Sequence, residues 1–117
     1  MIKLKQLIEQ EQPKENKEFI EFCKKRLEGA TKIVNNAKEK GGPSMLTYHH
    51  FVVKLPYYEK ASKGEFNCEM AKVELKNYTH TFCSLDEKVE IDQIEFQKLV
   101  GLIEVLGELI IKHRETK

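Results

Sequence analysis

The fold is decided by residues 96–111, FQKLVGLIEVLGELII, in which ten of the sixteen side chains are large and apolar. At 100° per residue, these side chains cover an arc of roughly 240° around a helix. A helix this apolar needs cover on most sides, either as the central helix of a bundle or from a second copy of the chain. Gly101 and Gly107 lower the helix propensity and indicate another backbone nearby.

We predict a two-fold homodimer through this helix, because three neighbouring helices in a small bundle do not easily cover so much apolar surface. In a two-fold pair the same stripe of side chains meets itself. The predicted interface consists of Gly101, Leu102, Val105 and Leu109. If the helix is central to one subunit instead, these side chains belong to its core.

Upstream of this helix, residues 17–40 carry apolar side chains at alternating steps of three and four, which is typical of a helix with one buried face. Gly41-Gly42-Pro43 ends that helix, since glycine suits a left-handed C-cap and proline prevents continuation. Residues 1–12 form a short amphipathic helix or a docked arm, and Pro13 indicates a break before the next helix.

Residues 67–85 repeat the helical pattern behind Asn67, a favourable N-cap. Asp86 to Val89 is expected to form a turn. Asp92 with Glu95 resembles a capping box at the start of the last helix. Residues 45–55, MLTYHHFVVKL, combine strand-favouring side chains with no alternation, and we favour a short helix capped by Thr47.

Together these patterns predict an all-α fold, an antiparallel helical bundle. It consists of four main helices, residues 17–40, 46–61, 67–85 and 92–113, plus a short N-terminal helix, in a single domain 1–117 whose residues 1–15 form a docked arm. Pro56 is expected to kink the second helix or to start a new turn.

The charge balance argues against several classes of partner. The chain has 20 basic and 19 acidic residues, so no strong overall field attracts nucleic acid or a membrane surface. Its three cysteines fit no zinc-site spacing and are expected as free thiols in a reducing compartment. The longest apolar run, residues 99–111, is too short to span a bilayer and contains two glutamates. We therefore expect a cytoplasmic protein.

The segment KEKGGPSMLTYHH, residues 38–50, is a candidate anion site. A glycine turn leads into a helix start, where free backbone N–H groups, hydroxyls and lysines suit phosphate or carboxylate. The candidate ligand-binding residues are Lys40, Gly41, Gly42, Ser44, Thr47, Tyr48, His49, His50 and Tyr57. The segment lacks the spacing of a P-loop or a dinucleotide fold, and an ordinary interhelical turn is the competing interpretation.

No set of residues specifies a reaction. His49 and His50 are adjacent and diverge on a helix, while His80 and Cys83 form the only local Cys/His pair. We predict no catalytic residue, no metal ligand and no cofactor.

The resulting hypothesis is a small non-enzymatic binding module, an adaptor, inhibitor or sequestering protein, that acts as a homo-oligomer. Its partners are a second copy and an unknown protein or a small anionic ligand. One alternative is a binder of a phosphorylated ligand or nucleotide at residues 41–50. The other is a metal-dependent or Cys/His enzyme that uses His49, His50, His80 and Cys83.

Overall fold

The computed structural model describes the backbone of residues 2–85 and 92–116 and the side chains from Lys17 onward within those ranges. These residues form α-helices joined by turns, with no β-strand among them, which confirms the all-α prediction. The helices are α1 (Ile2–Lys40), α2 (Ser44–Val52), α3 (Leu55–Ser62), α4 (Cys68–Cys83) and α5 (Gln93–Glu115).

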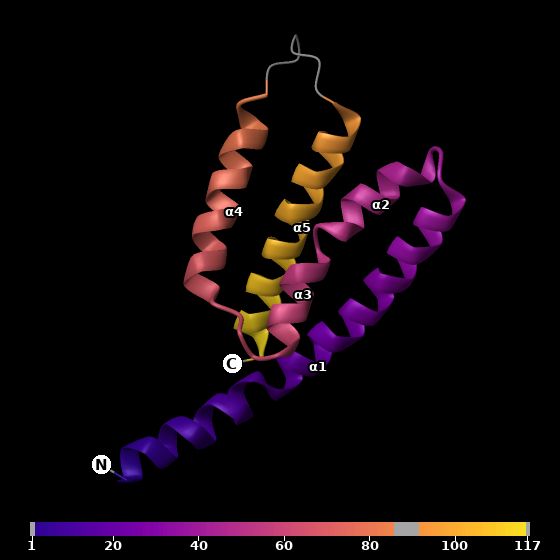
Figure 1. Cartoon of the computed structure of the whole chain (residues 1–117). Helices are drawn as coiled ribbons and strands as arrows, with labels where there is room; N and C mark the ends of the chain where they lie inside the picture. The colour runs from indigo at the N-terminus through magenta and orange to yellow at the C-terminus, as the bar shows by residue number, and fades with distance from the viewer. Residues whose placement is uncertain (1, 86–91, 117) are drawn as a thin grey trace.

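The chain reverses direction after α1, after α3 and between α4 and α5 (Figure 1). After α1 the direction reverses, and α2 and α3 return along the second half of α1. α4 and α5 then run side by side in opposite directions, and α5 lies between α4 and α2. α4 is therefore an outer helix, whereas α5 has neighbours on two sides.

The predicted break near Pro13 is wrong, because α1 is one helix from Ile2 to Lys40. A proline inside a helix removes a single N–H donor at a cost of about 3 kcal/mol. The lysine, glutamate and glutamine residues on both sides of Pro13 favour helix, and the flanking turns keep their own hydrogen bonds. The separate N-terminal helix is thus the first part of α1.

The turn after α1 follows the prediction, but the start of α2 does not. Gly41 and Gly42 adopt positive φ angles of 62° and 53°, as expected where a helix ends at glycine. α2 begins at Ser44 behind Pro43, so Thr47 lies inside the helix and does not cap it. The turn itself supplies acceptors for the first N–H groups of α2, and no side-chain cap is needed.

Residues 45–55 are helical and not a strand, as favoured, but the single helix predicted over 46–61 is two helices. α2 ends at Val52 and α3 begins at Leu55, with Pro56 in its first turn. Proline is accommodated there because the first N–H groups of a helix have no partner within it.

The caps of the last two helices confirm the sequence prediction. The Asn67 side chain accepts a hydrogen bond from the Met70 N–H at 3.0 Å. The Asp92 side chain accepts one from the Ile94 N–H at 2.8 Å. Each cap stabilises its helix by about 1 kcal/mol. The turn expected at residues 86–89 lies outside the described residues.

α5 supplies three of the five largest fully buried side chains, Val105, Leu106 and Leu109. Its buried residues are Gly101, Val105, Leu106, Leu109 and Ile110, and they pack with Phe19, Cys23, Ala30, Tyr58, Ala61 and Ala71. Val105 and Leu109, two residues of the predicted homodimer interface, are fully buried within one chain. α4 on one side and α2 with α3 on the other provide the cover that the prediction assigned to a second copy.

The two glycines of α5 differ in their surroundings. A Cβ atom at Gly101 would overlap the His50 carbonyl oxygen and approach Val53 Cγ2 to 2.8 Å. Here the expected close approach of another backbone is confirmed, and that backbone is α2. At Gly107 a Cβ atom would meet nothing within 4 Å, so no neighbouring backbone explains this glycine.

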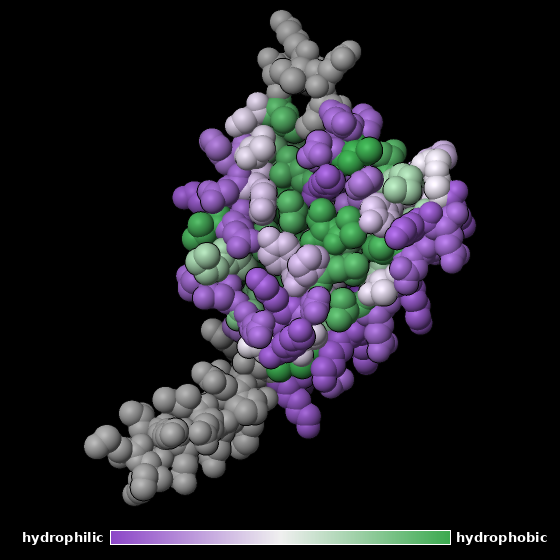
Figure 2. Space-filling view, in the orientation of Figure 1, coloured by the Kyte–Doolittle hydropathy of each residue, from purple (hydrophilic) through white to green (hydrophobic). Residues whose placement is uncertain are grey.

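The face drawn in Figure 2 carries hydrophobic surface along its middle, between α4 and α2, with hydrophilic surface around it. Leu99 and Leu102 of α5 are among the half-buried apolar residues of the chain. The cover of α5 is thus incomplete. Of the helices that the structure describes, none is both long and apolar enough to cross a membrane.

Candidate functional site

The predicted anion site is only partly assembled. Lys40, Ser44 and Thr47 line a small depression of about 180 Å³ against the end of α1. The N–H groups of Ser44 and Met45 donate to the carbonyls of Gly41 and Gly42 at 3.1 and 3.0 Å. The Leu46 N–H donates to the Pro43 carbonyl at 3.3 Å. These three N–H groups are therefore used within the turn, whereas the Lys40 ammonium and the Ser44 and Thr47 hydroxyls, the other donors of the prediction, belong to residues that line the depression.

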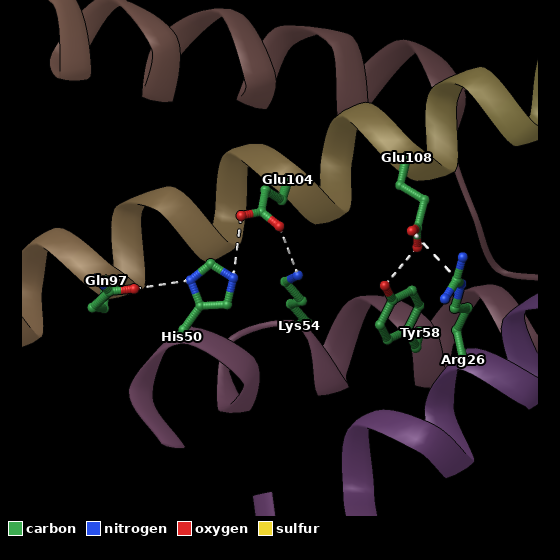
Figure 3. Close-up of polar contacts among 7 residues, drawn as sticks. All are labelled: Arg26, His50, Lys54, Tyr58, Gln97, Glu104 and Glu108. Carbon is green, nitrogen blue, oxygen red and sulfur yellow. Dashed lines mark hydrogen bonds and ion pairs between the residues drawn. The ribbon is translucent and has the colours of Figure 1, made fainter. Parts of the chain in front are cut away.

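The other candidate residues of this site point elsewhere. The His49 ring lies edge-on to the Tyr48 ring at 5.0 Å. His50 turns toward α5 (Figure 3), and the Tyr57 hydroxyl donates to Glu74 Oε2 on α4 at 2.7 Å. The nine predicted residues are therefore spread over separate parts of the molecule and do not form one pocket.

His50 takes part in a polar contact between α2 and α5 that sequence reasoning missed. Its Nδ1 lies 3.1 Å from Gln97 Oε1, and its Nε2 lies 3.2 Å from Glu104 Oε2 (Figure 3). Two ring nitrogens that both face oxygen acceptors each need a proton in order to donate. Both ring nitrogens of His50 thus link α2 to α5.

Lys54 completes this contact from the short turn between α2 and α3. Only 6% of its surface is exposed, and its ammonium donates to Glu104 Oε1 at 3.2 Å. The same nitrogen lies 4.7 Å from the centre of the Phe51 ring, a cation–π distance. The buried charge is thus paired, as burial of an ammonium requires.

A second polar contact joins α5 to α3 and α1. The Tyr58 hydroxyl donates to Glu108 Oε1 at 2.5 Å, and Arg26 Nε lies 3.6 Å from Glu108 Oε2 (Figure 3). Burial, followed by the hydrogen bond to Glu108, raises the pKa of Tyr58 well above its ordinary value. These groups are placed to hold helices together, since they lie between packed elements and not in a cleft.

The cysteines offer no activated nucleophile in this contact region. Cys23 is fully buried, and burial together with the nearby Glu108 carboxylate raises its pKa to about 12. A nucleophilic thiol needs the opposite shift. Among residues 17–85 and 92–116, no group of three His, Cys, Asp or Glu side chains lies close enough together to hold a metal ion.

A concave surface lies between α4 and α5, on the side where Ile110 and Arg114 face α4. We call it the α4–α5 groove. It encloses about 560 Å³ and is lined by Lys72, Leu75, Lys76, Thr79, His80, Cys83, Ile110 and Arg114. His80 and Cys83, the local Cys/His pair of the sequence, therefore lie in this groove.

The chemistry of the α4–α5 groove differs from that of the other hollows. A groove of similar volume, about 550 Å³, lies between α1 and α5. Its lining includes lysines of α1 and α5 but also Glu18 and Glu21. A smaller pocket of about 230 Å³ near Tyr57 contains Glu65 and Glu74. Among the described residues, the lining of the α4–α5 groove carries Lys72, Lys76 and Arg114 and no carboxylate.

Sequence reasoning missed this groove, although part of its signal was present. Lys72, Lys76 and His80 follow each other at steps of four and so share one side of a helix. Which residues of α5 would face them depends on how the two helices pack. No protein-family model, curated protein or solved structure matches the chain.

Proposed function

We propose that the protein is a small non-enzymatic binding module, an adaptor, inhibitor or sequestering protein, that binds other proteins along α4 and the adjoining side of α5. In this proposal the helices act as an antiparallel bundle, with α4 as the outer helix. The free thiols Cys23, Cys68 and Cys83 suit a reducing compartment, and we place the activity in the cytoplasm.

The observation that carries the proposal is where apolar side chains remain exposed. The exposed large hydrophobic residues are Met70, Val73, Phe82 and Leu85 on or next to α4, Ile111 on α5, Ile33 on α1 and Leu46 on α2. Most of this set lies on or next to α4 and α5, and α4 packs mainly on α5. Apolar surface that gathers in one region is typical of sites where other proteins bind.

A peptide-display selection against the immobilised protein tests this proposal. Enriched peptides are expected to shift backbone NMR signals of α4 and the second half of α5. Val73→Glu, at a side chain that is 55% exposed, should weaken their binding without unfolding the chain. Ile33→Glu, at 38% exposure on α1, is the matched control and should bind as the wild type does. Peptides that shift the α1–α2 corner instead would contradict the proposal.

Self-association is the second part of the proposal, and it is now restricted to the surface that one chain leaves open. Of the predicted interface, Leu102 keeps accessible surface, and it lies on the helix whose cover is incomplete. Sedimentation at micromolar concentration should show a dimer that Leu102→Glu dissociates and Ile33→Glu does not. A wild-type protein that sediments as a 13.7 kDa monomer would remove this part of the proposal.

A further inference from the structure

The α4–α5 groove has the shape of a docking site for a helix. From Lys72 to Cys83 its α4 wall extends over twelve residues, or about 16 Å along the helix axis. The opposite wall is α5, which runs alongside α4 (Figure 1). The α4 wall matches about three turns of a third helix laid along it, and Ile110 and Arg114 line the α5 side.

The floor of the groove is apolar, and its α5 side is open. Leu75 and Ile110 lie between the charged groups of the rim. One turn to each side of Ile110 on α5, Gly107 has no atom within 4 Å of a Cβ position, and Arg114 belongs to the rim. Ile111 beside them is 58% exposed. An apolar helix face therefore finds both a floor and room to approach it.

The rim sets the charge of the occupant. Lys72, Lys76 and Arg114 give three positive charges, and none of the lining residues that the structure describes is acidic. The whole chain has a net charge of only +1, so this concentration is local. Lys72 contacts the Glu69 carboxylate at 3.2 Å, but Glu69 is 84% exposed, and such exposed pairs are weak enough for a partner's carboxylate to replace.

We propose that the α4–α5 groove binds an acidic amphipathic helix of a partner protein, with the apolar face on Leu75 and Ile110 and the carboxylates on Lys72, Lys76 and Arg114. This inference rests on the proposed binding function and names its partner class. A nucleic acid would use the cations but not the apolar floor, and it would need a broader basic surface. The combination of floor and rim is the reason for choosing a protein helix.

The test uses a synthetic probe, an acidic peptide of about 18 residues with leucines on one face, glutamates beside them and alanine or glutamine elsewhere. The comparison peptide carries lysine in place of each glutamate. NMR titration of the full chain is expected to shift amides of residues 72–83 and 107–114 with the acidic peptide. The lysine peptide is expected to bind at least about tenfold more weakly, because the rim repels it.

Two charge-reversal variants distinguish the effect of the groove's own charges on peptide binding from the effect of the protein's net charge. Lys72→Glu/Lys76→Glu should weaken the acidic peptide about tenfold or more, since it reverses two charges of the rim. Lys32→Glu/Lys38→Glu changes the net charge equally at two exposed positions of α1 and should leave the dissociation constant within about twofold. Circular dichroism of both variants confirms that they are folded.

Several results would overturn the inference: equal loss in both variants, equal binding of the lysine peptide, or tighter binding of a duplex oligonucleotide than of the acidic peptide. If the acidic peptide does not bind while display-selected peptides still map to α4, the acidic-helix inference is wrong and the binding function stands. If the selected peptides also fail to map to α4, both the acidic-helix inference and the proposed binding function are wrong.

Discussion

The two sides of α5 are packed against their neighbours by different kinds of contact. Toward α2 and α3, the helix is held by close backbone approach at Gly101 and by the paired charges of Glu104 and Glu108. Toward α4, contact is mostly apolar and leaves the α4–α5 groove open. The first side is specified by shape and by polar pairing, whereas the second is specified by hydrophobic burial.

This difference indicates which side of α5 can bind a partner protein. Polar pairs between helices depend on geometry, and breaking one leaves a buried group without its partner. An apolar contact tolerates an additional helix as long as water is excluded. The α4 side is therefore the part of the molecule that can bind without first losing internal contacts.

The greatest loss of stability is expected from shortening a side chain on the buried face of α5. Leu109→Ala should lower the free energy of unfolding by about 2–5 kcal/mol, because it removes a fully buried side chain and leaves a cavity. Ile111→Ala, at 58% exposure two residues away, should change it by about 0.5 kcal/mol or less. Urea denaturation measures both, and equal effects would mean that α5 is not central.

The glycines provide the next test. Gly101→Ala should destabilise the protein by about 1–3 kcal/mol or more, since the new methyl group meets the backbone of α2. Gly107→Ala meets nothing within 4 Å and should stabilise the protein by up to about 1 kcal/mol through helix propensity. Thermal unfolding of the pair decides this, and a stabilising Gly101→Ala would refute the close approach.

The contribution of the polar contacts on the α2 side of α5 can be tested at Glu104. Glu104→Ala leaves the buried Lys54 ammonium without its carboxylate and should cost about 1–3 kcal/mol. Glu69→Ala breaks an exposed pair with Lys72 on α4 and should cost less than about 0.5 kcal/mol. If urea denaturation gives similar losses for the two variants, the polar contact does not specify the α2 side.

The smallest effect at neutral pH is expected from the buried thiol. The pKa of Cys23 rises from 9.0 to about 12 on folding, so the native state keeps a proton that the unfolded chain loses. This stabilisation is complete below about pH 9 and is lost as the pH rises toward 12, and the raised pKa of Tyr58 acts in the same direction. Cys23→Ala should flatten the fall in urea midpoint above pH 9, and an unchanged slope would contradict this.

Local signals in the sequence were sufficient for most helices. Asn67 and Asp92 were recognisable as caps because their effect acts within three residues. The predicted break at Pro13 was wrong because one helix-breaking residue competes with the helix preference of the long segments on both sides of it. The apolar arc of α5 correctly indicated cover on two sides, but periodicity does not tell a neighbouring helix from a second copy.

The functional sites were less predictable because they depend on packing between distant segments. The residues of the Gly41 corner looked available for an anion, yet the turn uses their N–H groups internally. The pairing of His50 with Gln97 and Glu104 joins positions 47 and 54 residues apart, for which no local pattern exists. The α4–α5 groove likewise depends on the register of two helices.

The polar contacts of α5 also bear on how the chain folds. The hydrogen bonds Lys54–Glu104 and Tyr58–Glu108 each join residues 50 positions apart, whereas α1 with α2 and α4 with α5 pair between neighbours in sequence. Closing the longer loop costs more chain entropy before any contact compensates for it. The two helical hairpins should therefore form first, and their docking through Glu104 and Glu108 should limit the folding rate.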